Sequence, residues 1–311
     1  MLSLTDVKSY IPENRYTVTE IAVKAGLTAA QAHIYYKFYG LEFIAVADKM
    51  HTCQLLTNVV GTLLAKTATN HFDTKQIKYL IYCHTAQVMV PFGDAMLDRI
   101  KNRFGLSEAI AFGVSMNKCV STLSCFEIAE KLLDQKNMSV LIITGEVAFT
   151  PALRIVPNTS VVGDAAAAIL VNRDGQRNKL MANVSHTYGR FSPGVWLTPE
   201  YIAEFEASYL TMLQKVVAAA LAQANICIND IKIILPHNVN YPSWYKMAKI
   251  LNVPLNLIFL DNIKKYGHCF GADVLINLES ILAKDLLKPG DYFMMVTVGL
   301  GAVFAATIFR H

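Results

Sequence analysis

A single cysteine lies where a strand-like stretch of the chain gives way to an amphipathic one. In GVSMNKCVSTLSCFEIAEKLL, which runs from Gly113 to Leu133, Cys119 precedes apolar residues that fall near one helical face. We therefore expect Cys119 near the N-terminus of a helix, where unpaired N–H groups and the helix dipole favour an anion. A thiolate is stabilised at such a position, so Cys119 is a candidate nucleophile. The position alone also fits a cysteine that only fills the core.

Two histidines in the second half of the chain are candidate partners for this thiol. His237 follows an apolar strand in ILPHNVN, with Asn240 three residues further on, and His268 stands between a glycine and an apolar helix in YGHCFGADVLINL. Ligand sites collect at the strand ends on one edge of a parallel sheet, so the thiol and both imidazoles could meet there. Near the C-terminus, Gly299 and Gly301 would form a turn whose N–H groups can approach a substrate closely.

The elements that would position these residues alternate between strands and helices. Continuous apolar runs of strand length are KYLIYCH, MSVLIITG, IKIILPH and YFMMVTVG, and segments of helical period such as LLTNVVGTLLAKTATNHF and YLTMLQKVVAAALAQAN lie between them. Apolar strands separated by helices predict an α/β fold with mainly parallel pairing and helices on both faces of the sheet.

This alternation repeats along the chain. The strand that begins at Ile77 matches the one that begins at Ile231, and the strand near Met138 matches the one near Asp291, with almost the same offset of about half the chain. We interpret this as an internal duplication and divide the chain into halves, 1–172 with the candidate cysteine and 173–311 with the two histidines. A site between the two halves is expected.

Composition excludes several classes of protein. The chain has 311 residues, of which 53% are hydrophobic and 17% charged, and its net charge of +4 includes no Lys/Arg-rich run that would indicate nucleic acid. No signal peptide and no apolar run of membrane-spanning length is visible, so we expect a cytoplasmic protein without a membrane partner. The six cysteines form no C-x-x-C pair, so neither disulfides nor zinc are expected.

Four motifs follow one another along the chain: a cysteine at a helix start, P-H-N-x-N, Y-G-H before a helix, and G-x-G near the terminus. In this order, they resemble the motifs of the thiolase superfamily. Within it, the chain is most similar to the condensing enzymes of the ketoacyl-acyl-carrier-protein synthase III group. IPENRYTVTEIA, VGDAAAAILV, YGHCFGAD and GLGAVFAATIFR extend the resemblance over nearly the whole chain. It implies a thiolase-like fold, in which two duplicated α/β halves with mainly parallel sheets form α-β-α-β-α layers.

The resemblance also implies a reaction. Cys119 would take an acyl group from a thioester, with the N–H groups of Cys119 and Gly301 as the oxyanion hole. His237 and His268 would stabilise the enolate formed when a malonyl thioester loses carbon dioxide, and that enolate would attack the acyl-cysteine. Asn240 is expected to contact substrate. Val90, next to Met89, matches the segment that lines the acyl tunnel across a dimer in relatives, although an ordinary loop is an alternative.

One departure from the synthase III pattern leaves the reaction open. That group has asparagine where this chain has His268, and a histidine can act as a general base where asparagine cannot. The leading hypothesis is decarboxylative condensation in fatty acid, polyketide or other secondary-metabolite biosynthesis. The alternatives are an acyltransferase that passes the acyl group to an oxygen or nitrogen nucleophile, and a partner-dependent subunit of a heteromeric ketosynthase.

A second departure concerns the acyl donor. No permanently bound cofactor and no metal are expected, and the substrates would be acyl-CoA or acyl-carrier-protein thioesters. The tryptophan and arginine that hold coenzyme A in relatives correspond to Ile34 and Phe38, so an acyl carrier protein is favoured as donor. Its docking rim could consist of four basic residues, Lys101, Arg103, Lys264 and Lys265. A homodimer is expected, and a heterodimer is possible.

Overall fold

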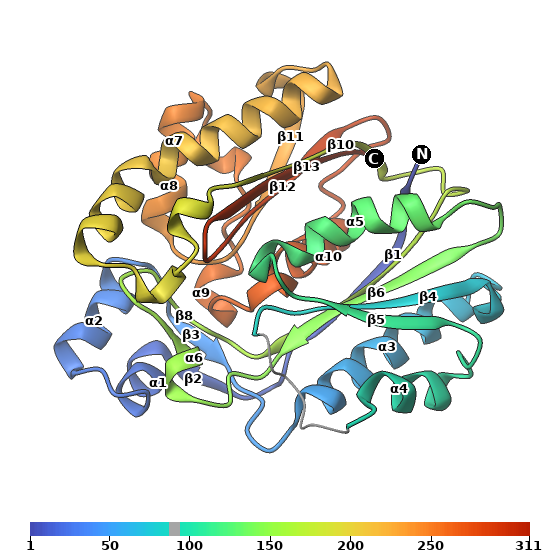
Figure 1. Ribbon diagram of the computed structural model, residues 1–311, viewed down its shortest axis with the longest axis horizontal. Coiled ribbons are helices and arrows are strands. Elements are labelled where there is room, and N and C mark those ends of the chain that lie inside the picture. Colours follow the sequence, from blue (N-terminus) through green and yellow to red (C-terminus); the bar gives the residue numbers. More distant parts are fainter. Residues whose placement is uncertain (87–93) are drawn as a thin grey trace.

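One mixed β-sheet runs through the whole protein, which is represented here by a computed structural model (Figure 1). The structure describes residues 1–86 and 94–311. Among these residues, the large sheet has nine strands in the order β11-β12-β13-β10-β1-β9-β6-β4-β5. Their bounds are β1 Ser3–Tyr10, β4 Ile77–Cys83, β5 Ile110–Val114, β6 Ser139–Glu146, β9 Ala165–Asn172, β10 Lys179–Thr187, β11 Ile231–Pro236, β12 Tyr292–Gly299 and β13 Val303–Arg310.

The sheet consists of two blocks, one from each half of the chain. Strands β1, β9, β6, β4 and β5 form the first block, and β10, β13, β12 and β11 form the second. The blocks are joined between β1 and β10, where one residue pair, Ser3 with Lys179, is in register. The order of elements is the same in both. In the first half it is β1, α3 (Thr52–Ala68), β4, α5 (Ser121–Leu132), β6 and β9, and these correspond to β10, α7 (Pro199–Ala224), β11, α10 (Asp273–Ala283), β12 and β13. This is the duplicated α/β architecture that the sequence predicts, while the boundary after residue 172 stays a prediction.

Strand direction is mixed. Parallel pairing occurs where the sequence pattern predicts it, between β4 and its two neighbours and between β11 and β12. The central pairings are antiparallel. β13 runs opposite to β12 because a short turn connects them directly, and β9 runs opposite to both of its neighbours, β6 and β1. The carboxyl ends of β4, β6, β11 and β12 are therefore the strand ends that can share a site.

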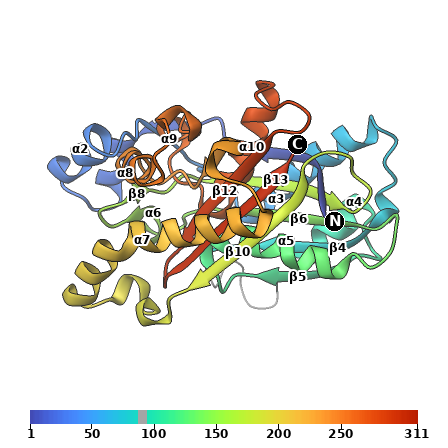
Figure 2. The same ribbon diagram turned by 90° about the horizontal axis from the view of Figure 1, so that it is seen from above.

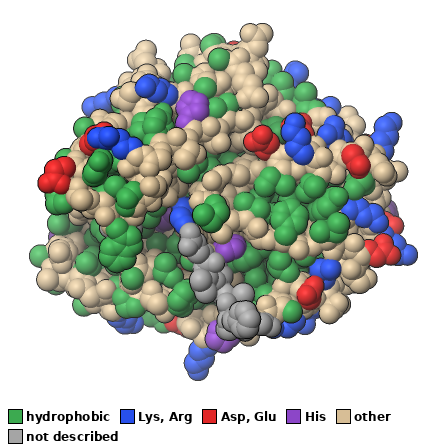
Figure 3. Space-filling model, viewed as in Figure 1, with side chains coloured by type: hydrophobic (Ala, Val, Ile, Leu, Met, Phe, Trp, Pro, Cys, Tyr) green, Lys and Arg blue, Asp and Glu red, His purple; other side chains and the backbone are tan. Residues whose placement is uncertain are grey.

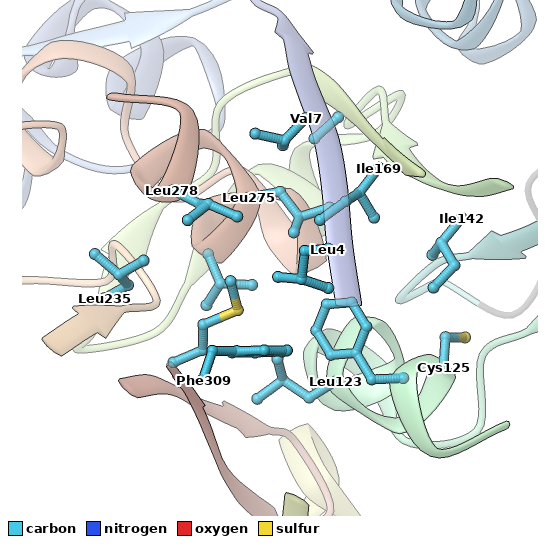
Figure 4. Close-up of a cluster of buried hydrophobic side chains, with 14 of the residues drawn as sticks. Leu4, Val7, Leu123, Cys125, Ile142, Ile169, Leu235, Leu275, Leu278 and Phe309 are labelled. Carbon is cyan, nitrogen blue, oxygen red and sulfur yellow. The ribbon is translucent and has the colours of Figure 1, made fainter. Parts of the chain in front are cut away.

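Two helices form the middle layer between the blocks. These are α5 (Ser121–Leu132) and α10 (Asp273–Ala283), and Figures 1 and 2 show them enclosed by strands of both halves. Their apolar faces meet side chains from both blocks in one buried core (Figure 4). Leu123 of α5 and Leu275 of α10, for example, join Leu4 of β1 and Phe309 of β13. The N-termini of the two equivalent helices are thereby brought together.

The outer layers complete the α-β-α-β-α arrangement. Helices α3 (Thr52–Ala68) and α4 (Met96–Phe104) belong to the core of the first block, and α7 (Pro199–Ala224) and α8 (Tyr241–Leu251) to that of the second. Among the described residues, no helix is both long and apolar enough to cross a membrane.

The remaining elements are short. The helices are α1 Val18–Lys24, α2 Ala29–Lys37, α6 Pro151–Arg154 and α9 Ile263–Tyr266, and the strands are β2 Arg15–Thr17, β3 Phe43–Ala45, β7 Ile155–Val156 and β8 Ser160–Val161. The 3-10 turns are η1 Thr74–Gln76, η2 Lys118–Val120, η3 Gly189–Phe191, η4 Gly194–Trp196, η5 Ile228–Asp230, η6 Leu255–Leu257 and η7 Phe270–Ala272.

Candidate active site

Cys119 lies in the turn η2, which leads directly into α5. The residue is 7% exposed and is therefore buried. The preceding residue, Lys118, has φ +54, a left-handed conformation that is uncommon for a residue other than glycine. Such strained backbone clusters at functional sites because the surrounding structure must enforce it. The sharp turn places the thiol at the entry of α5, where the sequence predicts it.

His268 contacts this thiol from the other half of the chain. Its Nε2 atom is 3.6 Å from Sγ of Cys119, and both side chains are buried. Backbone hydrogen bonds to the first half hold the loop that carries it: the N–H of His268 donates to the carbonyl of Val161 at 3.1 Å, and the N–H of Gly163 donates to the carbonyl of His268 at 2.9 Å. A Cβ on Gly163 would overlap the carbonyl of Tyr266, so glycine permits this close approach.

Asp273, the first residue of α10, completes a buried chain with His268 and Cys119. Its Oδ2 atom lies 2.5 Å from Nδ1 of His268, and its carboxylate also accepts the backbone N–H groups of Cys269 at 2.7 Å and Asn238 at 2.6 Å. Burial alone would lower the pKa of His268, but the Asp273 carboxylate and the Cys119 sulfur raise it to about 10. At neutral pH, His268 is therefore an imidazolium whose Nε2–H faces the sulfur.

His237 lies beside His268 and has the opposite charge preference. It follows β11, and its ring centroid is 6.1 Å from that of His268. Its backbone N–H donates to Val296 at 3.0 Å, and its carbonyl accepts the indole N–H of Trp244 at 3.0 Å. Burial, with the charge of His268, lowers the pKa of His237 to about 3, so this ring is neutral. Its Nδ1 has no hydrogen-bond partner within the part of the chain that the structure describes.

The glycine turn between β12 and β13 packs against the residues that precede Cys119. A Cβ on Gly299 would collide with the carbonyl of Asn117, and Gly301 has φ +96, which strongly favours glycine. The two turns are thus neighbours, as an oxyanion hole shared by Cys119 and Gly301 requires.

Two further predicted residues are Asn240 and Val90. Asn240 caps α8, because its side-chain oxygen accepts the N–H of Ser243 at 2.8 Å and its amide donates to the carbonyl of Thr159 at 3.0 Å. It therefore has a structural role, and its contact with substrate stays a prediction. Val90 lies outside the described residues.

The four basic residues suggested as a docking rim do not form one surface. Lys101 and Arg103 lie on α4, whereas Lys264 and Lys265 lie on α9, and both views show these helices well apart (Figures 1 and 2). Lys101 also pairs with Asp98 at 3.9 Å. Within residues 1–86 and 94–311, no group of three or more His, Cys, Asp or Glu residues could hold a metal ion.

The sequence singled out Cys119, His237 and His268, and the structure brings these three together. It did not assign roles to Asp273, which contacts His268, to Thr85, which contacts the thiol, or to Glu146, which accepts the N–H groups of Thr85 and Ala86. A signal for Asp273 exists in the sequence, since an aspartate five residues after a histidine and at a helix start can accept from its ring. A glutamate at the end of the apolar run MSVLIITGE is a comparable signal for Glu146.

The layered architecture, with buried Cys119 next to His268 and His237 beside His268, is that of a thiolase-like fold. Residues 221–311 match the family described as 3-Oxoacyl-[acyl-carrier-protein (ACP)] synthase III C terminal. The beta-ketoacyl-[acyl-carrier-protein] synthase III of Lactococcus lactis subsp. cremoris is 23% identical over 96% of this chain and 95% of its own. That of Aquifex aeolicus is 22% identical over 65% of this chain and 67% of its own. The resemblance to the synthase III group is thereby confirmed.

Solved structures share the complete fold. The synthase III of Aquifex aeolicus covers 100% of both chains with a TM-score of 0.82 and 18% identity. ChlB3, described as an acyltransferase, covers 99% of this chain and 97% of its own, with a TM-score of 0.86 and 17% identity. OleA of Xanthomonas campestris, solved with lauric acid and lauroyl-CoA, has a TM-score of 0.84 at 14% identity, with coverage of 100% and 99%. The predicted thiolase-like fold is confirmed.

Proposed function

We propose that this protein is a condensing enzyme that loads an acyl group onto Cys119 and joins it to a malonyl thioester with loss of carbon dioxide. The observation that carries the proposal is the buried chain from Cys119 through His268 to Asp273, with neutral His237 beside it. The relatives named as synthase III enzymes support the same reaction.

In the first half-reaction, the thiolate of Cys119 attacks the carbonyl carbon of an acyl thioester. The backbone N–H groups of Cys119 and Gly301 would stabilise the oxyanion, and loss of one such donor typically lowers the rate about 100- to 1,000-fold. The bond from the carbonyl carbon to the donor sulfur then breaks. His268 gives its Nε2 proton to the departing thiolate and becomes neutral.

In the second half-reaction, His268 has regained its Nε2 proton from solvent, because its Nδ1–H faces Asp273, and His237 is a neutral hydrogen-bond donor. The carboxylate of the malonyl thioester leaves as carbon dioxide, and its bonding electrons form an enolate whose oxygen accepts from His237 and His268. The enolate carbon attacks the acyl carbonyl, and Cys119 departs as a thiolate. A covalent intermediate of this kind divides one difficult step into two and gives ping-pong kinetics.

Intact-protein mass spectrometry tests both steps in one experiment. Incubation with acyl-CoA or acyl-carrier-protein thioesters should add one acyl mass, and subsequent malonyl-carrier protein should remove it with release of carbon dioxide. An acyl-enzyme that releases no carbon dioxide with any partner would contradict condensation. Because the residues that correspond to the coenzyme A clamp of relatives are Ile34 and Phe38, we expect faster loading from the carrier protein.

Acyl transfer to an oxygen or nitrogen nucleophile is the second candidate. Once the proton has left, His268 paired with Asp273 is suited to remove a proton from an acceptor, a role that asparagine could not fill. The structural similarity to ChlB3, described as an acyltransferase, is consistent with this alternative.

We further propose a homodimer formed along the edge strand β5. This strand pairs with β4 on one side, and no partner strand lies on its other side among the described residues. Ile110 of β5 is 60% exposed, and partly buried apolar side chains of β5 and α5 extend the surface, namely Phe112, Val114, Ile128 and Leu132. Figure 3 shows apolar side chains gathered over this face. An exposed apolar edge is a template for pairing with a second chain.

A cytoplasmic location completes the proposal. All six cysteines are free thiols, which fits a reducing compartment.

A further inference from the structure

A hydroxyl group approaches the candidate nucleophile beside His268. Oγ1 of Thr85 lies 3.5 Å from Sγ of Cys119, an ordinary length for a hydrogen bond to the large sulfur atom. Thr85 follows β4, the strand of the first half that corresponds to β11 and its terminal His237 in the second half. A hydroxyl carries one hydrogen, and a thiolate can only accept, so the contact is a donation from Thr85 to Cys119.

Glu146 holds the segment that carries this hydroxyl. Its carboxylate accepts the backbone N–H groups of two consecutive residues, Thr85 and Ala86, the latter at 2.9 Å. Glu146 is the last residue of β6, which pairs in parallel with β4, so its side chain is level with the bend after β4. Two hydrogen bonds from one rigid carboxylate fix both the position and the orientation of a two-residue bend.

The burial of this carboxyl needs an explanation. Glu146 is 1% exposed at the end of an otherwise uncharged strand, and an isolated carboxylate at such a place is costly. Burial raises the pKa of Glu146 to about 7, although the hydrogen bonds from Ala86 and Thr85 and the charge of His268 act in the opposite direction. Among the described residues it forms no ion pair with Lys or Arg. Its hydrogen bonds are those with the backbone N–H groups of Thr85 and Ala86, and it also interacts with the side chain of Thr85, so all of them hold the bend.

We propose that Thr85 is a second hydrogen-bond donor to the Cys119 thiolate and that Glu146 is the positioning residue that keeps Thr85 in place. The inference rests on the proposed role of Cys119 as nucleophile. The second half-reaction gives a reason why Cys119 has two hydrogen-bond donors, His268 and Thr85. When Cys119 is expelled as a thiolate in the second half-reaction, His268 is donating to the enolate-derived oxygen, and the hydroxyl of Thr85 is still directed at the sulfur.

Alkylation by iodoacetamide tests the first part without any acyl donor. The rate reports how much of Cys119 is thiolate, and peptide mapping assigns the adduct. Thr85→Val keeps the shape and removes the donor, so the rate at neutral pH should fall about 10- to 100-fold, the effect expected for a lost hydrogen bond to a charged group. The pH–rate profile should move to higher pH, and Thr85→Ser should restore the wild-type profile.

The chain offers a matched control for this substitution. Thr144 lies on β6, two residues before Glu146, and its buried hydroxyl has no hydrogen-bond partner in the described ranges. Thr144→Val should therefore alkylate like the wild type. Thr85→Ala replaces Thr85→Val if the latter does not fold. Wild-type kinetics in folded Thr85→Val or folded Thr85→Ala would overturn the proposal.

A double-mutant cycle tests the positioning role of Glu146. Glu146→Gln presents an amide NH₂ to one of the two backbone N–H groups, which displaces the bend and should slow alkylation about tenfold. If Glu146 acts through Thr85, Glu146→Gln should add little to Thr85→Val, because residues that act as one unit are not additive. Fully additive effects would contradict this role. Altered alkylation in a protein that accepts no acyl group would contradict the proposed function alone.

Discussion

Nδ1 of His268 lies 2.5 Å from Oδ2 of Asp273, and this contact distinguishes the two histidines of the site. Both rings are buried and their centroids are 6.1 Å apart, so two imidazolium charges here would repel each other. Of the two, His268 alone has a carboxylate beside it among the residues that the structure describes. The pKa of His268 rises to about 10 and that of His237 falls to about 3. Groups whose pKa values are driven apart in this way take different roles, His268 as acid and His237 as neutral donor.

Asp273→Asn tests this division. The amide cannot act as a negative partner, so the pKa of His268 should fall and its hydrogen bond with Cys119 should weaken. Acyl loading at neutral pH is expected to slow about 10- to 100-fold, as for loss of a hydrogen bond between charged groups. Single-turnover loading measured by mass spectrometry gives the rate. Asp261→Asn, which removes an exposed carboxylate paired with Lys284, is the control and should load normally.

The same contact predicts a pH dependence of stability. His268 has a higher pKa in the folded protein, about 10, than in the unfolded chain, about 6.5. Between these values the folded protein holds a proton that the unfolded chain has released, so the stability gained at lower pH is lost as pH rises through this window. Urea unfolding should be measured between pH 8 and 10. This range lies above the pKa of Glu146, which is about 7, so the titration of Glu146 does not contribute to the change.

Comparison of two proteins isolates this effect. The free energy of unfolding should fall with pH in the wild type, by on the order of a few kcal/mol, and clearly less in Asp273→Asn. Parallel curves for the two proteins would mean that His268 is not the group that titrates.

Acylation at Cys119 is the prediction that follows most directly from its position. Cys119→Ala should form no acyl adduct, because it removes the only sulfur that His268 contacts among the described residues. Cys125→Ala is the matched control on the same helix, since Cys125 is fully buried with its Sγ 3.2 Å from that of Cys83. That variant should load at the wild-type rate. An adduct that persists in Cys119→Ala would locate the nucleophile elsewhere.

The main site residues could be predicted because they stand at element ends, which short sequence patterns mark well. Cys119 directly precedes α5, His237 directly follows β11, and His268 precedes α10. The duplication explains why these ends meet, since α5 and α10 are equivalent helices whose N-termini face one site. Periodicity thus predicted both the layers and three site residues.

The remaining features depend on distances across the sequence that no local pattern encodes. Apolar strands look alike in parallel and antiparallel sheets, so the antiparallel central pairings were not visible. Thr85 and Glu146 are 61 residues apart, and only the parallel pairing of β4 with β6 places them together. Asn240 illustrates the opposite case, because its motif resembles a substrate contact while its amide caps a helix.

Ile110→Lys tests the proposed dimer. A lysine on the exposed edge strand β5 would bury a charge in the interface, and charged edge residues oppose strand pairing. Light scattering after size exclusion should shift from twice the mass of 34.4 kDa toward the monomer. Ile250→Lys on α8, which is also exposed, is the control and should leave the mass unchanged. A monomeric wild type would contradict the proposal.

His268→Asn distinguishes condensation from acyl transfer. Asparagine can donate a hydrogen bond to an enolate oxygen but cannot take a proton from an acceptor. Because Asp273 would be left as a buried, unpaired carboxylate, the change is best made together with Asp273→Asn. If the enzyme condenses, substantial malonyl decarboxylation should survive in this double variant. If it transfers acyl groups to a hydroxyl or an amine, turnover of acyl-Cys119 should fall about 100- to 10,000-fold, the range for loss of a general base.

The paired measurement is carbon dioxide release from malonyl-carrier protein and decay of acyl-Cys119 with acceptors. Two results together would establish the acyltransferase instead. The wild type would release no carbon dioxide, and its acyl group would pass to an acceptor, whereas the variant without His268 would keep its acyl group.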